Sequence, residues 1–174
     1  GTLQRMNRRR WMKLGLGSAA LLAVGGGWLA ATTEPGWQRA GFSAPAQRLW
    51  VALGRAFLDG TLPAEPQAQT LALQGLVQRL HVAVSALPVH AQQELSQLLL
   101  LLASAPGRRA VAGLATDWPD ASVPDIQAAL QDMRSSRISL RVQAYLALHD
   151  LVGAAYFSEP ATWSVLDYPG PMKL

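Results

Sequence analysis

Apolar residues recur three or four positions apart along most of the chain after residue 44, which places them on one face of an α-helix. This pattern predicts helices over residues 45–59, 67–86, 90–104, 122–134 and 136–157, with one or two further turns over 108–115. The run 98–103 is apolar on every side, which predicts that the third helix is central and fully surrounded. No stretch alternates with period two for long enough to predict a strand. We therefore expect an all-α fold, a compact helical bundle of about five to six helices.

Proline, glycine and capping residues mark the ends of these helices. Gly60, Pro88 and Pro106 each follow an apolar helical run, where a helix normally stops. Ser122 followed by Asp125 resembles a capping box at a helix start. The predicted parts are a signal or anchor segment over 1–33, a linker over 34–44, the bundle over 45–157 and an irregular tail over 158–174.

The basic charge of the chain lies almost entirely at its N-terminal end. The formal net charge is +4, but residues 1–13 contain five of the fifteen Lys and Arg side chains. The other 161 residues therefore contain ten basic and eleven acidic side chains. A nucleic-acid-binding domain needs a basic face on its folded body. We therefore expect no nucleic-acid partner.

A motif near the N-terminus resembles the twin-arginine export signal, in which two arginines precede a variable residue, a bulky apolar pair and often a lysine. The matching residues are Arg8, Arg9, Trp11, Met12 and Lys13. Such signals are addresses read by a receptor, the twin-arginine translocon. This motif predicts export to the periplasm.

Residues 14–33 are uncharged and long enough to cross a bilayer, but they contain five glycines, which lower helix propensity. Moderate hydrophobicity of this kind is typical of a twin-arginine signal. The residues around Ala31 fit a cleavage site only loosely. Two fates stay open, which are cleavage after export and retention as an anchor in the inner membrane.

The rest of the chain shows no recognisable catalytic chemistry. It has no cysteine, so disulfides, thiolate metal sites and covalent haem attachment are excluded. His81, His90 and His149 lack a metal-binding spacing, and neighbours such as His149 and Asp150 point about 100° apart on a helix. No phosphate loop or nucleophile elbow occurs. We therefore expect no catalytic, cofactor-binding or metal-binding residue in this chain.

Three groups of residues are candidates for a partner interface. Trp118 lies in a proline-bearing loop, where it is either a lid on the core or an interface anchor. Arg134, Arg137 and Arg141 would share a helix face if the helix were continuous, either as a solvated face or as a docking surface for an acidic partner. The tail contributes two large aromatic residues and a predicted turn, and we expect them to pack on the bundle, on a partner or on both. These residues are Trp163, Tyr168, Pro169, Gly170 and Pro171.

The order of these features resembles a known family. The stretches "PGRRAVAGLATDWPDAS", "MRSSRISLRVQAYLALHDLVGAAYF" and "EPATWSVLDYPGP" follow the twin-arginine leader. Together they resemble the gluconate 2-dehydrogenase subunit 3 (gamma subunit) family, over residues 6–171. The resemblance implies a non-catalytic small subunit that carries the export signal for a folded, FAD-containing dehydrogenase of the glucose–methanol–choline type. In such complexes FAD lies in the partner, and a cytochrome c subunit can accept the electrons.

Two other functions compete with this interpretation. A stand-alone periplasmic binding or scaffold protein would have a self-contained C-terminus and no flavoprotein partner. An enzyme of unrecognised type is the third alternative. The substrate of the partner enzyme, the stoichiometry and the individual contact residues are left open by the sequence.

Overall fold

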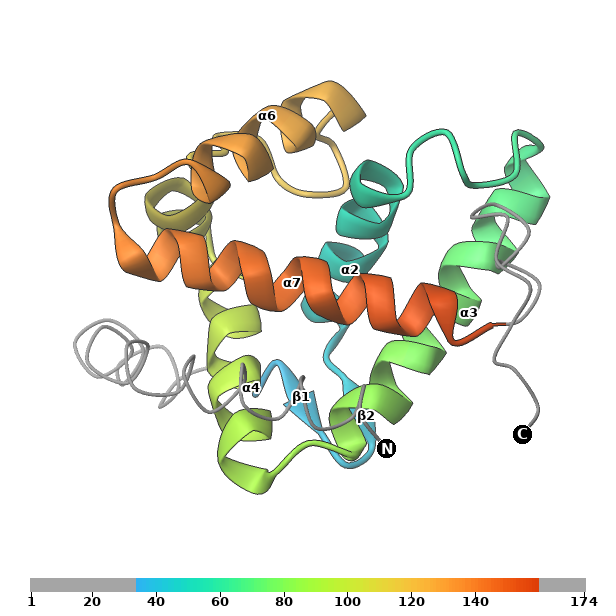
Figure 1. Ribbon diagram of the computed structural model, residues 1–174, viewed down its shortest axis with the longest axis horizontal. Helices are drawn as coiled ribbons and strands as arrows, with labels where there is room; N and C mark the ends of the chain where they lie inside the picture. The colour runs from blue at the N-terminus through green and yellow to red at the C-terminus, as the bar shows by residue number, and fades with distance from the viewer. Residues whose placement is uncertain (1–33, 160–174) are drawn as a thin grey trace, which may run out of the picture.

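The computed structural model describes residues 34–159, and it confirms the expected all-α fold (Figure 1). Five of the predicted helices are present with similar bounds: α2 Ala44–Phe57, α3 Pro66–Ser85, α4 Val89–Ala103, α6 Val123–Arg134 and α7 Ser139–Phe157. The short turns between α4 and α6 are α5 Ala105–Gly107 and the π-helix η1 Arg108–Ala112. No helix within residues 34–159 combines the length and apolar character needed to span a bilayer.

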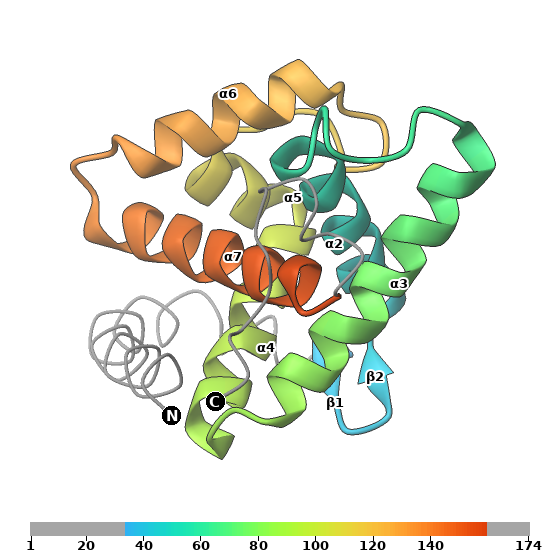
Figure 2. The same ribbon diagram turned by 45° about the vertical axis from the view of Figure 1, so that its right-hand side comes forward.

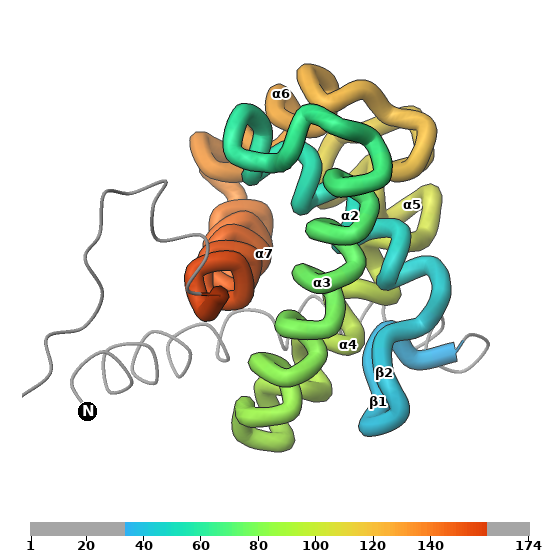
Figure 3. The backbone as a smooth tube through the Cα atoms, turned by 90° about the vertical axis from the view of Figure 1, so that its right-hand side faces the viewer, coloured from blue at the N-terminus to red at the C-terminus, as the bar shows by residue number. Residues whose placement is uncertain are grey.

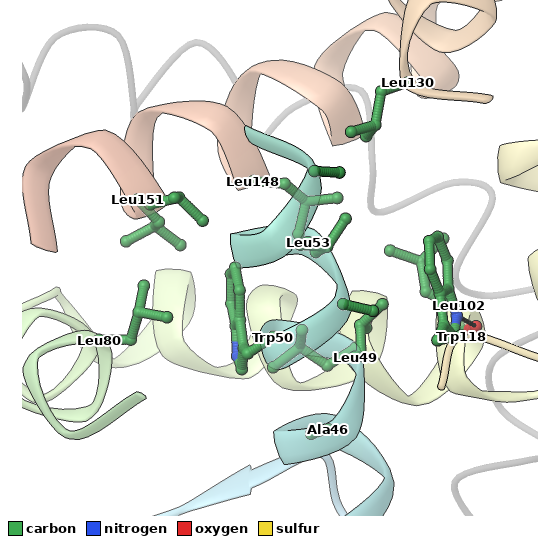
Figure 4. Close-up of a cluster of buried hydrophobic side chains, with 14 of the residues drawn as sticks. Ala46, Leu49, Trp50, Leu53, Leu80, Leu102, Trp118, Leu130, Leu148 and Leu151 are labelled. Carbon is green, nitrogen blue, oxygen red and sulfur yellow. Dashed lines mark hydrogen bonds between the residues drawn. The ribbon is translucent and has the colours of Figure 1, made fainter. Parts of the chain in front are cut away.

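Helix α2 forms the centre of the core. It contacts α3, α4, α6 and α7, which surround it in Figures 1 and 2. Leu49, Trp50 and Leu53 are completely buried along it (Figure 4). The prediction that the third helix would be fully surrounded is wrong, because Leu100 and Leu101 of α4 are only half-buried. An apolar run marks burial on average but does not say which helix is central.

Residues 34–44 do not form a simple linker. They contain a two-stranded antiparallel hairpin, β1 Trp37–Gln38 and β2 Gly41–Phe42, in which Trp37 pairs with Phe42. Gly41 adopts a φ of 138°, a conformation that favours glycine. Both aromatic side chains are buried in the core cluster. The linker prediction is therefore corrected: this segment is part of the folded body.

Local capping explains where the helices begin. Ser43 and Ser122 accept hydrogen bonds from the backbone N–H groups of Ala46 and Asp125, as capping serines do. The carboxylate of Glu65 accepts from Gln67 N at 3.0 Å and Ala68 N at 2.7 Å. Both hydrogen bonds lower the pKa of the Glu65 carboxyl, and the one from Ala68 lowers it more.

Helix α3 holds both ends of the described chain. Trp37 of the hairpin donates from Nε1 to Nδ1 of His81 at 3.1 Å. At the other end, Arg79 donates from Nε to the carbonyl of Ala155 in the last turn of α7 at 2.9 Å. Figure 3 shows α3 between the hairpin and the end of α7. Two residues within one turn of α3 therefore join segments that are more than a hundred residues apart.

Candidate partner interface

Trp118 lies in the core rather than on the surface. Its side chain is 2% exposed, and its Nε1 donates to the carbonyl of Leu102 at 2.8 Å (Figure 4). That carbonyl needs an outside donor, because the residue four positions later is Pro106, which has no N–H. The indole therefore completes the end of α4. The interface prediction for Trp118 is corrected, and the lid on the core is what the structure shows.

The buried guanidinium of Arg108 fixes the loop that carries Trp118. It donates to the carbonyls of Leu114 at 3.2 Å and Ala115 at 3.1 Å, and it pairs with Asp117 Oδ1 at 3.1 Å. The same Asp117 oxygen accepts from the N–H of Trp118 at 2.9 Å. Arginine suits this position because its planar fork of donors can bind several acceptors at once. The polar side chains of Arg108 and Asp117 therefore hold this loop in place from within the protein.

The predicted arginine stripe does not form as one helix face. Helix α6 ends at Arg134, and the chain turns before α7 begins at Ser139. The hydroxyl of Ser136 accepts from the N–H of Ile138 at 3.1 Å and stabilises that turn. Arg134 and Arg137 are exposed. The single helix face is therefore ruled out: Arg134 is the last residue of α6 and Arg137 lies in the turn, while a docking role for these two exposed arginines stays a prediction.

Arg141 has a structural role instead. Its Nε donates to the carbonyl of Val111 at 2.8 Å, at the C-terminal end of η1. A cation is favourable there because unpaired carbonyls collect at a helix C-terminus. Gly113 follows η1 with a φ of 67°, the left-handed conformation of many helix ends. Arg141 consequently joins α7 to η1.

The other predicted site residues lie outside the described part of the chain. They are Arg8, Arg9, Trp11, Met12 and Lys13 of the export motif, and Trp163, Tyr168, Pro169, Gly170 and Pro171 of the tail.

Sequence reasoning missed the outer sides of α3 and α4, two successive helices that are joined by a short turn. Residues 66–103 contain only two charged side chains, Arg79 and Glu94. Within residues 34–159, Leu71, Val82 and Val89 are the most exposed large apolar side chains, at 65–68%. Protein interfaces are depleted in charge at their centre, so this combination marks the best candidate for a partner interface. The scarcity of charge over residues 66–103 was the available signal.

A groove opens at one end of this surface, between β1 and α4. Its volume is about 370 Å³, and Trp37, Val89 and Leu100 contribute apolar lining between four glutamines. Ser96 fixes its floor, because its hydroxyl accepts from Trp37 N at 3.0 Å and donates to Trp37 O at 3.2 Å. An uncharged groove of this size fits an apolar side chain or a small uncharged ligand.

Burial raises the pKa of the Glu94 carboxyl above its ordinary value, and the charge of nearby His90 partly offsets that increase. Glu94 is the only acid on α4, so the surface is close to neutral whatever its protonation state.

Two of the three histidines, His81 and His149, pack against aromatic side chains. His81 accepts from Trp37, and its ring lies 6.1 Å from that of Phe42. His149 stacks on Tyr145 at 5.6 Å and lies edge-on to Phe57 at 5.5 Å. Residues 34–159 contain no group of three or more His, Asp or Glu side chains placed to hold a metal ion.

One expectation about His149 is wrong. Its Nδ1 lies 3.3 Å from Asp150 Oδ1, although neighbours on a helix project in different directions. Both side chains bend toward each other at the surface, where a pair contributes little to stability.

Comparison of the chain with family models, with curated proteins and with solved structures gives no match. The function is therefore argued from the residues and their arrangement.

Proposed function

We propose that this chain is the non-catalytic small subunit of a periplasmic FAD-dependent dehydrogenase complex. The observation that carries the proposal is the twin-arginine motif at Arg8 and Arg9, placed ahead of an α-helical body in which no catalytic grouping was recognised. Twin-arginine export moves folded proteins, and FAD has to be inserted before the flavoprotein leaves the cytoplasm. One leader on a small subunit can therefore export a folded partner that lacks its own.

In this proposal the small subunit contacts the flavoprotein through the uncharged surface of α3 and α4 and through Tyr168 to Pro171 of the tail. FAD stays in the partner, and this chain binds no cofactor. A cytochrome c subunit belongs to the same proposal as the electron acceptor. The charge-poor outer side of α3 and α4 supports the contact, because desolvating it on binding costs little.

The test replaces both Arg8 and Arg9 with Lys in cells that make the complex. We expect the flavoprotein and its flavin absorbance to disappear from the periplasmic fraction and to accumulate in the cytoplasm. Arg10→Lys is the matched control, because Arg10 occupies the variable position of the motif and its replacement should leave export intact. Unchanged export of the flavoprotein in the double variant would contradict the proposal.

A stand-alone binding protein is the second candidate, and the groove between β1 and α4 is the observation that favours it. Its volume of about 370 Å³ lies within the range of small-molecule sites. The two functions differ in the purified protein: a subunit co-purifies with a flavin-containing chain, whereas a binding protein is a monomer without flavin. Mass spectrometry and flavin absorbance of the purified material separate them.

A further inference from the structure

Leu71 and Val82 define an exposed apolar stripe on α3, the helix that also binds the last turn of α7. Leu71 and Val82 are each 68% exposed. They are eleven residues apart, which is close to three helical turns, so they lie on the same face. Gln74 and Gln78 between them are exposed and uncharged. Isolated exposed apolar residues are common, but two on one uncharged helix face form a surface that another segment can cover.

The chain leaves the described structure next to this stripe. Arg79 binds the carbonyl of Ala155 at 2.9 Å, and its Nη1 lies 3.7 Å from Glu159 Oε2. Val82 is one turn further along α3 than Arg79, about 4.5 Å along the helix axis, and Leu71 lies about 12 Å in the other direction. Figure 3 shows the end of α7 lying against α3. The described chain therefore ends beside Arg79, on the helix that carries the stripe.

The next seven residues match the stripe in chemistry and in reach. Residues 160–166 read "PATWSVL", which contains no charge and three large apolar side chains, Trp163, Val165 and Leu166. Seven extended residues span up to about 24 Å, enough to reach either Val82 or Leu71. The leader is a poorer occupant, because the chain before Trp37 lies against α4, where Gly36 packs on Ser96 and Leu99 and Pro35 lines the groove.

We propose that residues 160–166 cover the stripe of Leu71 and Val82 on α3 of the same chain. Covering it removes apolar surface from water at about 25 cal/mol per Å², and the short connection from Glu159 keeps the entropic cost of closing the loop small. This cover belongs to the isolated subunit and does not depend on the flavoprotein; a partner that binds the outer side of α3 has to displace residues 160–166 from Leu71 and Val82.

The chain contains no cysteine, so a single introduced thiol reports on one place. The experiment measures the rate of maleimide labelling of Val82→Cys in the full-length isolated subunit. The comparison is the same variant that also carries Trp163→Ala and Leu166→Ala. Asp132→Cys on α6, also exposed, is the matched control. We expect Val82→Cys to react about tenfold more slowly than the control, because labelling requires local opening. The two tail substitutions should restore the fast rate.

Each other outcome overturns the proposal. Equal labelling of Val82→Cys and Asp132→Cys in the full-length chain would mean that nothing covers the stripe. Slow labelling that persists after the tail substitutions would assign the cover to another occupant. If that slow labelling rate depended on protein concentration, the occupant would be a second copy of this chain. If the rate did not depend on concentration, the occupant would be the leader. Because Val82 is a surface residue, its replacement should not prevent folding.

Discussion

Trp50 and Trp118 are both almost completely buried, but their indole N–H groups differ. The N–H of Trp118 binds the carbonyl of Leu102, whereas the N–H of Trp50 has no hydrogen-bond partner among the described residues. A buried donor without a partner costs stability, and a buried acceptor costs stability when its partner is removed. The two positions therefore allow the hydrogen bond to be separated from the burial of the ring.

We expect Trp118→Phe to lower the free energy of unfolding by about 1–2 kcal/mol more than Trp50→Phe. Both changes remove similar apolar area, but only the first leaves the Leu102 carbonyl unpaired next to Pro106. Chemical denaturation followed by circular dichroism measures both variants. Equal losses would show that water or another donor replaces the indole, and the assigned role of Trp118 in ending α4 would be wrong.

At the scale of the elements, the junction of α4, α5 and η1 depends on one glycine. A Cβ atom on Gly107 would lie much too close to the carbonyl oxygen of Leu101, which is backbone and cannot move aside cheaply. Gly153 in α7 offers the opposite case, because a Cβ there would point into open space. The structure therefore has no room for a side chain at Gly107, whereas it has room for one at Gly153.

Gly107→Ala should destabilise the fold by about 1–3 kcal/mol, since the added methyl group forces the junction apart. Gly153→Ala is its control and should stabilise the fold by up to about 1 kcal/mol through helix propensity. Thermal unfolding of the two variants checks both signs. A neutral Gly107→Ala would indicate that α5 and η1 can shift without cost.

Periodicity and punctuation predicted the helices well, because each long helix has a continuous apolar face and a proline, glycine or serine at its end. The hairpin could not be predicted from two-residue strands, which are too short to show alternation. The break after Arg134 was predicted, but it extends to Ile138, so α7 begins three residues later than the predicted start at Ser136. Its cause is a local hydrogen bond of Ser136, which competes with the helical pattern.

The candidate site was harder to predict than the helices. Trp118 and Arg141 look like surface residues in a polar context, but each satisfies a backbone carbonyl that only the folded chain leaves unpaired. The need for such donors follows from tertiary structure and leaves no local signal. By contrast, the scarcity of charge over residues 66–103 is visible in the sequence.

For the molecule as a whole, Glu94 and Glu65 should influence the pH dependence of stability in opposite directions. The pKa of Glu94 is raised in the folded state by burial, so the folded state holds that proton more tightly than the unfolded chain. Stability from this group is therefore lost as pH rises from its ordinary value of 4.5 through the raised pKa. The lowered pKa of Glu65 gives stability that is lost as pH falls through that lowered value.

Glu94→Gln should consequently become more stable relative to the wild type as pH rises from about 4 to about 7. Glu65→Gln is the control of opposite sign, and its deficit should shrink as pH falls below that range. Urea midpoints test the signs when they are measured across this interval for Glu94→Gln and below it for Glu65→Gln. A stability difference for Glu94→Gln that stays constant with pH would show that the carboxyl is fully hydrated in the folded protein.

The clamping of both chain ends by α3 has a consequence for the timing of synthesis. The hairpin has to wait for His81 and Ser96, which follow Trp37 by 44 and 59 residues, and Arg79 has to wait a further 76 residues for Ala155. Ribosomes add about 5–20 residues per second, so the N-terminal segment precedes the last of these contacts by on the order of ten seconds. Under the proposed function, the export motif at residues 8–13 is therefore available to its receptor well before the chain is folded. That proposal then requires the receptor, or the cell, to delay transport until the end of α7 has left the ribosome.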